Sequence, residues 1–183
     1  MSWVKVPLPK LIYKTDESEV NEQVGADLIN GYINEFGHIR KRPGLTNLVD
    51  TGTTTPIQGI YWWRLYSCAI IVSGGRIWSK ASVGGALLEI TGDTLVATGR
   101  VSFAEGRTNE IDYLLMANGG RTVYWDGTGD TTFIADANAP IDVSHITWID
   151  GYALADTASK TGKIHFSNAN DVFTWDSIGF FTA

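Results

Sequence analysis

Runs of apolar residues separated by glycine-containing turns recur along the chain after its first fifty residues. Ala69–Val72 and Leu114–Ala117 are wholly apolar, and each leads into a Gly-Gly turn and then a segment that opens with arginine and carries tryptophan. Such turns favour tight β-hairpins, because the turn between two twisted strands needs residues with positive φ. A third copy, Tyr152–Ala155, reaches Lys163–Phe166 through a longer turn. The pattern predicts three hairpins whose first strands are buried on both faces.

One further strand is expected on either side of each hairpin. The opening strands are predicted at Ile57–Trp62, Arg100–Ala104 and Ser144–Ile149, and the closing strands at Leu87–Ile90, Thr131–Ile134 and Phe173–Trp175. Four short antiparallel strands in each repeat of about 40 to 50 residues are typical of a β-propeller blade. We therefore expect an all-β fold of repeated four-stranded antiparallel meanders, β-propeller-like, with about three blades at residues 56–96, 97–140 and 141–183. Residues 1–50 do not fit the repeat and are expected to be an irregular N-terminal segment before a propeller-like domain at 51–183.

Three blades are too few to close a ring, since known propellers have about four to eight. A partial ring leaves an apolar face and sheet edges open. The chain therefore belongs to a longer protein, or associates with copies of itself to complete the ring, or has an arrangement that is not a closed propeller. The apolar end at Ser177–Ala183 has the character of a segment inside a fold rather than of a solvated tail.

A basic cluster, Arg40-Lys41-Arg42, stands in the N-terminal segment just before a Pro-Gly turn. Side chains of this kind bind phosphates and carboxylates, so Arg40, Lys41 and Arg42 are the candidate partner contact. The alternative is a solvated turn whose charges are partly balanced by acidic side chains nearby.

The charge of the chain argues against a simple DNA-binding module. The net charge is -6; residues 1–100 carry 10 Lys/Arg and 9 Asp/Glu, whereas residues 101–183 carry 4 and 11. A DNA-binding module is expected to be basic, because its affinity comes from neutralising phosphates. An acidic surface still suits the wall of a passage through which DNA slides without sticking. The N-terminus lacks the apolar region of a signal peptide, and no apolar run reaches the roughly 18 residues of a membrane span, so we expect a soluble protein made in the cytoplasm.

The residue types that commonly carry chemistry are few and scattered. The histidines, His38, His145 and His165, have no metal-ligand spacing, and Cys68 lies in an apolar run as a core residue would. The sequence contains neither the G-x-S-x-G motif of a hydrolase nor a phosphate-binding P-loop. We therefore expect no metal, no cofactor and no catalytic residue.

Three features have a functional and a structural interpretation. Glu105 and Arg107 follow a predicted strand, where propeller glycosidases use carboxylates and arginine; the alternative, which we favour, is a turn with surface salt bridges. Trp62 and Trp63 are suited to stacking on sugars, but regularly placed aromatic residues more often pack between blades. The segment Ser167–Trp175 resembles the turn motif of sialidase propellers, which is structural and remote from catalysis.

Five segments occur in a fixed order within residues 28–175. They are Gly31–Leu45, Gly74–Trp78, Gly99–Thr108, Tyr124–Thr128 and Phe166–Asn168. Taken together, they resemble the packaged-DNA stabilisation proteins of short-tailed bacteriophages, which form the tail nozzle or hub below the portal. The resemblance implies a β-propeller-like virion protein that assembles as a ring and takes part in head closure, DNA retention and ejection. Members of that family are typically much longer, so the resemblance is to their N-terminal portion.

The expected function is therefore that of a structural virion protein in the tail or neck, without catalysis. Its expected partners are copies of itself in a ring, other portal and tail proteins of the phage, and packaged DNA that passes through but is weakly bound. A carbohydrate- or receptor-binding propeller module is the alternative, and a glycosidase is the least favoured interpretation.

Overall fold

The computed structural model describes residues 31–33, 39–41, 50–81, 85–159 and 162–182. The chain divides into two compact units, Met1–Thr46 and Asn47–Ala183. The regular secondary structure of the described residues consists of β-strands, without helices. The described residues contain no helix able to cross a membrane.

The described part of the first unit is a two-stranded antiparallel sheet. Strand β1 (Gly31–Ile33) pairs with β2 (Ile39–Lys41), with Gly31 opposite Lys41 and Tyr32 opposite Arg40. This hairpin contains two of the three residues of the basic cluster.

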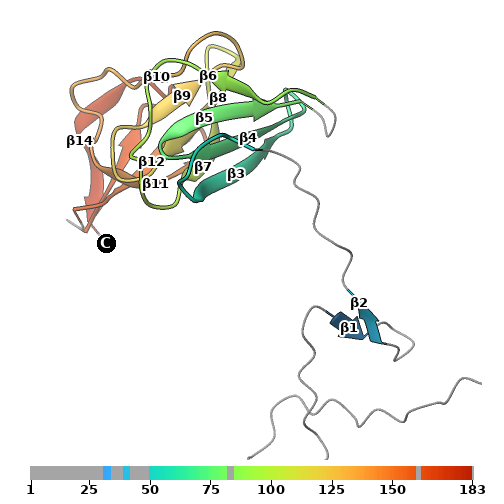
Figure 1. Ribbon diagram of the computed structural model, residues 1–183. Coiled ribbons are helices and arrows are strands. Elements are labelled where there is room, and N and C mark those ends of the chain that lie inside the picture. Colours follow the sequence, from blue (N-terminus) through green and yellow to red (C-terminus); the bar gives the residue numbers. More distant parts are fainter. Residues whose placement is uncertain (1–30, 34–38, 42–49, 82–84, 160–161, 183) are drawn as a thin grey trace, which may run out of the picture. The chain divides into compact units, whose positions relative to one another are not determined.

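Three four-stranded antiparallel sheets make up the described part of the second unit (Figure 1). The first sheet consists of β3 (Ile57–Trp63), β4 (Cys68–Ser73), β5 (Arg76–Lys80) and β6 (Leu88–Ile90). The second consists of β7 (Ser102–Thr108), β8 (Ile111–Ala117), β9 (Val123–Trp125) and β10 (Thr132–Phe133). The third consists of β11 (Val143–Ile149), β12 (Tyr152–Thr157), β13 (Lys163–Ser167) and β14 (Trp175–Thr182). Each sheet is a meander in chain order and the three do not close into a ring, so the predicted all-β, β-propeller-like fold of three partial-ring blades is confirmed.

Tight turns join the strands where the sequence offers residues that tolerate positive φ. Gly74 and Gly75 join β4 to β5 with φ of 60° and 78°. Asp150 and Gly151 join β11 to β12 with φ of 50° and 84°. Two consecutive residues with positive φ form the turn that matches the twist of the flanking strands. The Gly-Gly turn of the first sheet is therefore the hairpin that the sequence predicts.

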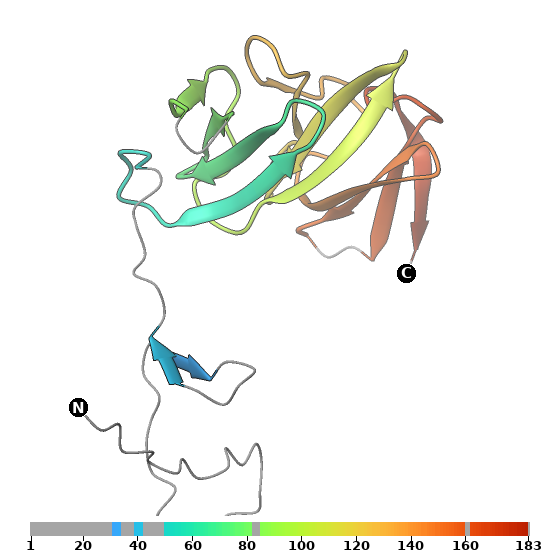
Figure 2. The same cartoon turned by 90° about the vertical axis from the view of Figure 1, so that its right-hand side faces the viewer.

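The sheets follow one another as layers, with an apolar core in each of the two spaces between them (Figure 2). The core between the first and second sheets includes Trp63, Ile70, Val72, Ile77, Leu114, Met116, Val123 and Trp125. The core between the second and third sheets includes Ala104, Leu115, Ala117, Val143, Ile146, Ala153, Ala155, Val172 and Trp175. The second sheet contributes to both cores, so β8 is buried on both faces from Leu114 to Ala117, as predicted. The same prediction is wrong for β12, whose outer face carries the exposed Tyr152 and the partly buried Leu154.

Each sheet has a buried polar residue near the end of its second strand. This residue lies beside the segment that leads into the sheet. These residues are Ser73, Asn118 and Thr157. Ser73 Oγ donates to the carbonyl of Thr55 at 2.9 Å, and the Asn118 amide donates to the carbonyl of Val96 at 2.7 Å. In the third sheet the next residue makes the bond, because Ala158 N donates to the carbonyl of Asp142 at 2.6 Å. In each sheet, the incoming chain is therefore anchored at this position or at the residue after it.

The closing strand of the third sheet differs from the prediction. Phe173–Trp175 was expected to form it, but β14 begins at Trp175 and continues to Thr182. Asp171 accepts hydrogen bonds from Phe173 N at 2.9 Å and from the Thr174 hydroxyl at 2.6 Å, which holds these residues in a turn. The strand therefore starts two residues later than expected, and Ser177–Thr182 of the apolar segment belongs to the sheet.

Candidate interaction surfaces

The structure places Arg40 and Lys41 in β2, where they stand opposite Tyr32 and Gly31 of β1. Arg42 lies outside the described residues. The role of Arg40, Lys41 and Arg42 as a partner contact stays a prediction.

Glu105 and Arg107 on β7 each bind a separate neighbour. The Tyr61 hydroxyl of the first sheet donates to Glu105 Oε1 at 2.7 Å. Arg107 donates from Nε and Nη2 to the two carboxylate oxygens of Asp112, at 2.8 and 3.0 Å. The hydrogen bonds from Arg107 hold the pKa of Asp112 below its ordinary value. These contacts are the surface hydrogen bond and salt bridge of the structural interpretation. The turn predicted at Glu105 and Arg107 is wrong, because β7 continues through both residues to Thr108.

The contact between Tyr61 and Glu105 gives a measurable property to the boundary between the first two sheets. The Tyr61 and Phe103 rings stack with centroids 5.2 Å apart, beside the hydrogen bond from Tyr61 to Glu105. Burial, the hydrogen bond and the negative charge of Glu105 raise the pKa of Tyr61 to about 12 from 10.0. The pKa of Tyr61 is higher in the folded protein than in the unfolded chain. The stability that the neutral Tyr61 hydroxyl contributes is therefore complete below pH 10 and is lost as the pH rises through about 12.

Replacing Glu105 by glutamine is expected to lower the pKa of Tyr61 without returning it to its ordinary value. The substitution removes the charge, whereas burial, the largest cause of the shift, remains. The pKa is read from the tyrosinate absorbance as the difference between each protein and its Tyr61→Phe counterpart. Asp112→Asn serves as a matched control, because the carboxylate that it removes binds Arg107 and not Tyr61. An unchanged pKa in Glu105→Gln would contradict the contact.

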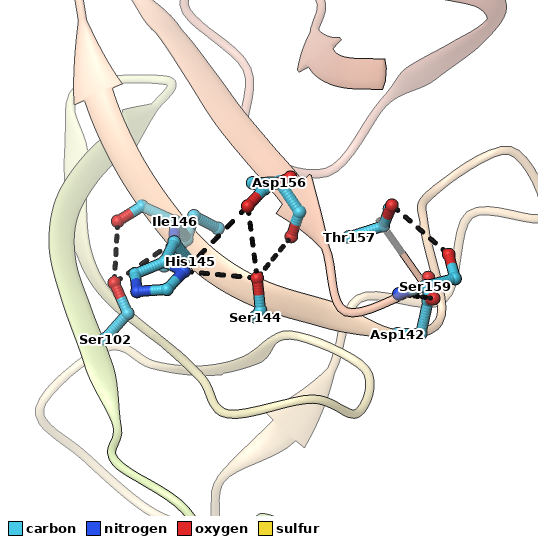
Figure 3. A network of polar contacts seen from close by, with 8 residues as sticks. All are labelled: Ser102, Asp142, Ser144, His145, Ile146, Asp156, Thr157 and Ser159. Atoms are coloured by element: carbon cyan, nitrogen blue, oxygen red, sulfur yellow. Dashed lines mark hydrogen bonds and ion pairs between the residues drawn. The ribbon is translucent and has the colours of Figure 1, made fainter. Parts of the chain in front are cut away.

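Ser144, His145 and Asp156 form a cluster with the composition of a hydrolase triad but not its geometry (Figure 3). Ser144 Oγ lies 3.1 Å from His145 Nδ1 and 3.3 Å from Asp156 Oδ2, and His145 Nδ1 lies 4.0 Å from Asp156 Oδ2. In a triad the serine meets Nε2 while the aspartate binds Nδ1. Here both groups approach the same nitrogen of an exposed ring, so the arrangement is a surface hydrogen-bond network. The sequence does not reveal it, because Asp156 meets the other two only through the pairing of β11 with β12.

The other residues considered for metal or thiol chemistry are dispersed. Cys68 is buried, and burial raises the pKa of its thiol. Burial, followed by the charge of Lys163, lowers the pKa of His165. His38 lies outside the described residues, among which no group of three or more His, Cys, Asp and Glu side chains could hold a metal ion.

Asp171 fixes the loop between β13 and β14 to the second sheet. Burial alone would raise its pKa, but hydrogen bonds from Thr174, Phe173 and Thr108 hold that pKa below its ordinary value. Thr108 of β7 donates to Asp171 Oδ1 at 3.1 Å and accepts from Val172 N at 2.8 Å. The Asp171 carboxylate thus binds both its own loop and β7, in keeping with a structural turn.

The tryptophans that are adjacent in sequence at the end of β3 have opposite environments. Trp63 is fully buried between the first two sheets, with ring centroids 4.5 Å from Tyr66 and 5.5 Å from Trp125. Trp62 points to the other face of the first sheet and is 56% exposed, and Ile60 on the same face is 67% exposed. The packing interpretation therefore holds for Trp63 but leaves Trp62 and Ile60 without cover.

The third sheet has an open apolar face at the other end of the stack. Ile149 and Phe181 are exposed there, and Tyr152 is exposed beside the partly buried Leu154 and Phe166. Contiguous apolar surface of this kind marks an interaction site more often than scattered exposed residues do. The outer faces of the first and third sheets are the candidate functional surfaces.

Neither the family models nor the curated proteins to which the chain was compared include a match to it.

Proposed function

We propose that the protein is a structural component of a phage virion, of the tail nozzle or head-closure type. It retains packaged DNA and forms part of the ejection passage, without catalysis. One observation carries this proposal: the described blades form a partial propeller that has an open apolar sheet face at each end. Such a unit fits a protein that is completed within an assembly.

Two features of the sequence support the same function. The five ordered segments resemble the packaged-DNA stabilisation proteins, whose role is in the phage tail. The acidic second part of the chain, with 4 Lys/Arg and 11 Asp/Glu in residues 101–183, repels phosphates. A passage wall with this charge lets DNA move during ejection instead of holding it.

The test is to place an amber codon in this reading frame in a phage that carries it. We expect heads that fill with DNA and then lose it, seen by electron microscopy and by loss of nuclease-protected DNA from the particles. The same phage grown in a suppressor host is the control. Mutant particles that keep their DNA and infect at the wild-type level would overturn the proposal.

A carbohydrate-binding module is the second candidate, and the exposed indole of Trp62 favours it. Aromatic faces stack on the apolar faces of sugar rings, and a solvent-exposed tryptophan is suited to this contact. A glycan array with the purified protein separates the two candidates. Strong and specific binding to one glycan, lost in Trp62→Ala, would favour the binding module over the structural role.

A further inference from the structure

The strand registers identify corresponding positions in the three sheets. In the first strand of each sheet, Ile60, Phe103 and Ile146 correspond, because they stand opposite Ile71, Met116 and Ala155. Those three partners each lie two residues before the buried polar residue near the end of the second strand, which is Ser73, Asn118 or Thr157. The residues two positions further along the first strands are Trp62, Glu105 and Trp148. The first and third sheets therefore share an Ile-x-Trp pattern at the same place.

Ile146 and Trp148 use this pattern to pack against the preceding sheet. Ile146 is buried, and its backbone N–H and carbonyl both bind Ser102 Oγ of the second sheet, at 3.1 and 3.0 Å (Figure 3). Trp148 lies over Gly106, where a Cβ would be 3.1 Å from Cε3 of the indole. Ile60 and Trp62 have the same residue types at the same positions, but no preceding sheet covers them among the described residues.

The surface that receives Ile146 and Trp148 also recurs. On the second sheet it is built by Tyr113, Leu115 and Tyr124, and the corresponding residues of the third sheet are Tyr152, Leu154 and Phe166.

The aromatic pairs of these two surfaces have the same geometry. The Tyr113 and Tyr124 rings meet edge to face with centroids 5.7 Å apart, and the Tyr152 and Phe166 rings meet edge to face at 6.2 Å. Phe173, in the loop between β13 and β14, covers the first pair, with centroids 4.9 and 4.8 Å from the two rings. The second pair lies on the open outer face of the third sheet, where Tyr152 is 37% exposed.

We infer that these two end faces bind each other between copies of the protein. The leading face (Ile60 and Trp62) of one copy packs on the trailing face (Tyr152, Leu154 and Phe166) of the next. The contact continues the interface between the second and third sheets, and it is head-to-tail because each copy offers a different face.

Charge favours the same pairing. Residues 57–90, which span the first sheet, contain three Lys/Arg and one Asp/Glu, for a net charge of +2. Residues 143–182, which span the third sheet, contain two Lys/Arg and four Asp/Glu, for a net charge of -2. On the faces themselves, the registers place Arg76, Lys80 and Glu89 on the leading face and Asp156 on the trailing face, so the difference in charge has the same sign there and unlike faces attract.

The inference deepens the proposed function, on which it rests for the role of the ring, but its test is separate. Association is measured by sedimentation velocity on the purified 183-residue chain, at roughly 1 to 100 µM, a range that detects micromolar dissociation constants. Trp62→Glu blocks the leading face and Tyr152→Arg blocks the trailing face, each with a charge that the opposite face repels. We expect each variant alone to have a dissociation constant raised by about 30-fold or more, as for a tryptophan or tyrosine at the centre of an interface.

Mixing the two variants is the decisive measurement. Trp62→Glu retains an intact trailing face and Tyr152→Arg an intact leading face, so the mixture is expected to form a one-to-one complex although neither variant associates alone. Leu88→Glu, at an equally exposed apolar residue outside both faces, is the matched control and should associate as the wild type does. Circular dichroism confirms that all variants fold.

Four outcomes would overturn the inference. A monomeric wild type would mean that copies do not cover these faces. Single variants that associate as the wild type does would place the contact elsewhere. One single variant that associates as the wild type does, while the other does not, would mean a symmetric contact between like faces. A mixture that stays monomeric while the wild type associates would mean that the leading face of one copy does not bind the trailing face of another. None of these results bears on DNA retention by particles, so the proposed function is judged separately.

Discussion

Replacing Gly75 by alanine is expected to destabilise the protein by about 3 kcal/mol or more. Gly75 has φ of 78°, and a Cβ there would lie 2.4 Å from the carbonyl oxygen of Leu95. That oxygen cannot easily move, because Leu95 N is bound to the carbonyl of Gly75 at 2.9 Å. Gly75 N also donates to Gln58 Oε1 at 2.6 Å. The substitution therefore strains the turn and also the segment that leads to the second sheet.

Gly119→Ala is the control for this prediction. Gly119 belongs to the corresponding turn of the second sheet and has φ of 99°, but a Cβ there would meet nothing within 4 Å. Only the conformational strain remains, which we expect to cost about 1–2 kcal/mol. The free energy of unfolding in urea, followed by circular dichroism, measures both. Equal losses would show that contact with Leu95 contributes nothing.

Truncating Trp63 to alanine is expected to cost about 3–5 kcal/mol, as for other large buried aromatic residues. Trp63 is fully buried and packs with Tyr66 and Trp125 between the first two sheets. The cavity left behind would be bounded by strands that are held by their own hydrogen bonds, so it would close only in part. Urea unfolding at low protein concentration, where copies do not associate, gives the loss directly.

The adjacent residue supplies the control for Trp63. Trp62→Ala removes the same side chain from an exposed position, and we expect a loss below about 1 kcal/mol. A comparable loss for the two variants would mean that the first sheet is covered on both faces in the isolated protein.

The strand pattern is the part of this fold that the sequence reveals most fully. Ala69–Val72 and Leu114–Ala117 are apolar at every position, and Gly-Gly turns after them predict hairpins. The tight turn forms between β4 and β5, but the one predicted between β8 and β9 is wrong, because residues 118–122 join those strands and Gly119 has positive φ while Gly120 does not. These signals are local, since a strand and its turn lie within about a dozen residues. The structure confirms the meanders for that reason.

The positions that depend on contact between sheets could not be predicted in the same way. Trp62 and Trp63 are the same residue type in adjacent positions, so the sequence does not distinguish them. The presence of a sheet on one side alone decides which of them is buried. Phe173 reads as part of a strand, but the carboxylate of Asp171 binds its N–H and makes a turn there. Ser144 and Asp156 come together only through strand pairing. Each of these outcomes rests on a partner distant in the chain.

One missed contact between sheets did have a signal in the sequence. Asp93 Oδ2 accepts from Phe133 N at 2.7 Å, and Asp136 Oδ2 accepts from Trp175 N at 3.1 Å. Each carboxylate thus binds the closing segment of the following sheet. Both aspartates lie three residues after an apolar residue of a predicted closing strand, Ile90 or Phe133. Alignment of the repeats on these strands would have identified them.

The meander order of the sheets also bears on how the chain reaches its fold. Every strand of the three sheets pairs through its backbone only with strands next to it in the chain. Few long loops must then close before native contacts form, and folding is faster when contacts are local. Residues 57–90 can complete a sheet while the ribosome is still adding the second one, which then settles against a preformed surface. The order of synthesis thus becomes the order of assembly, with each new layer templated by the one made before it.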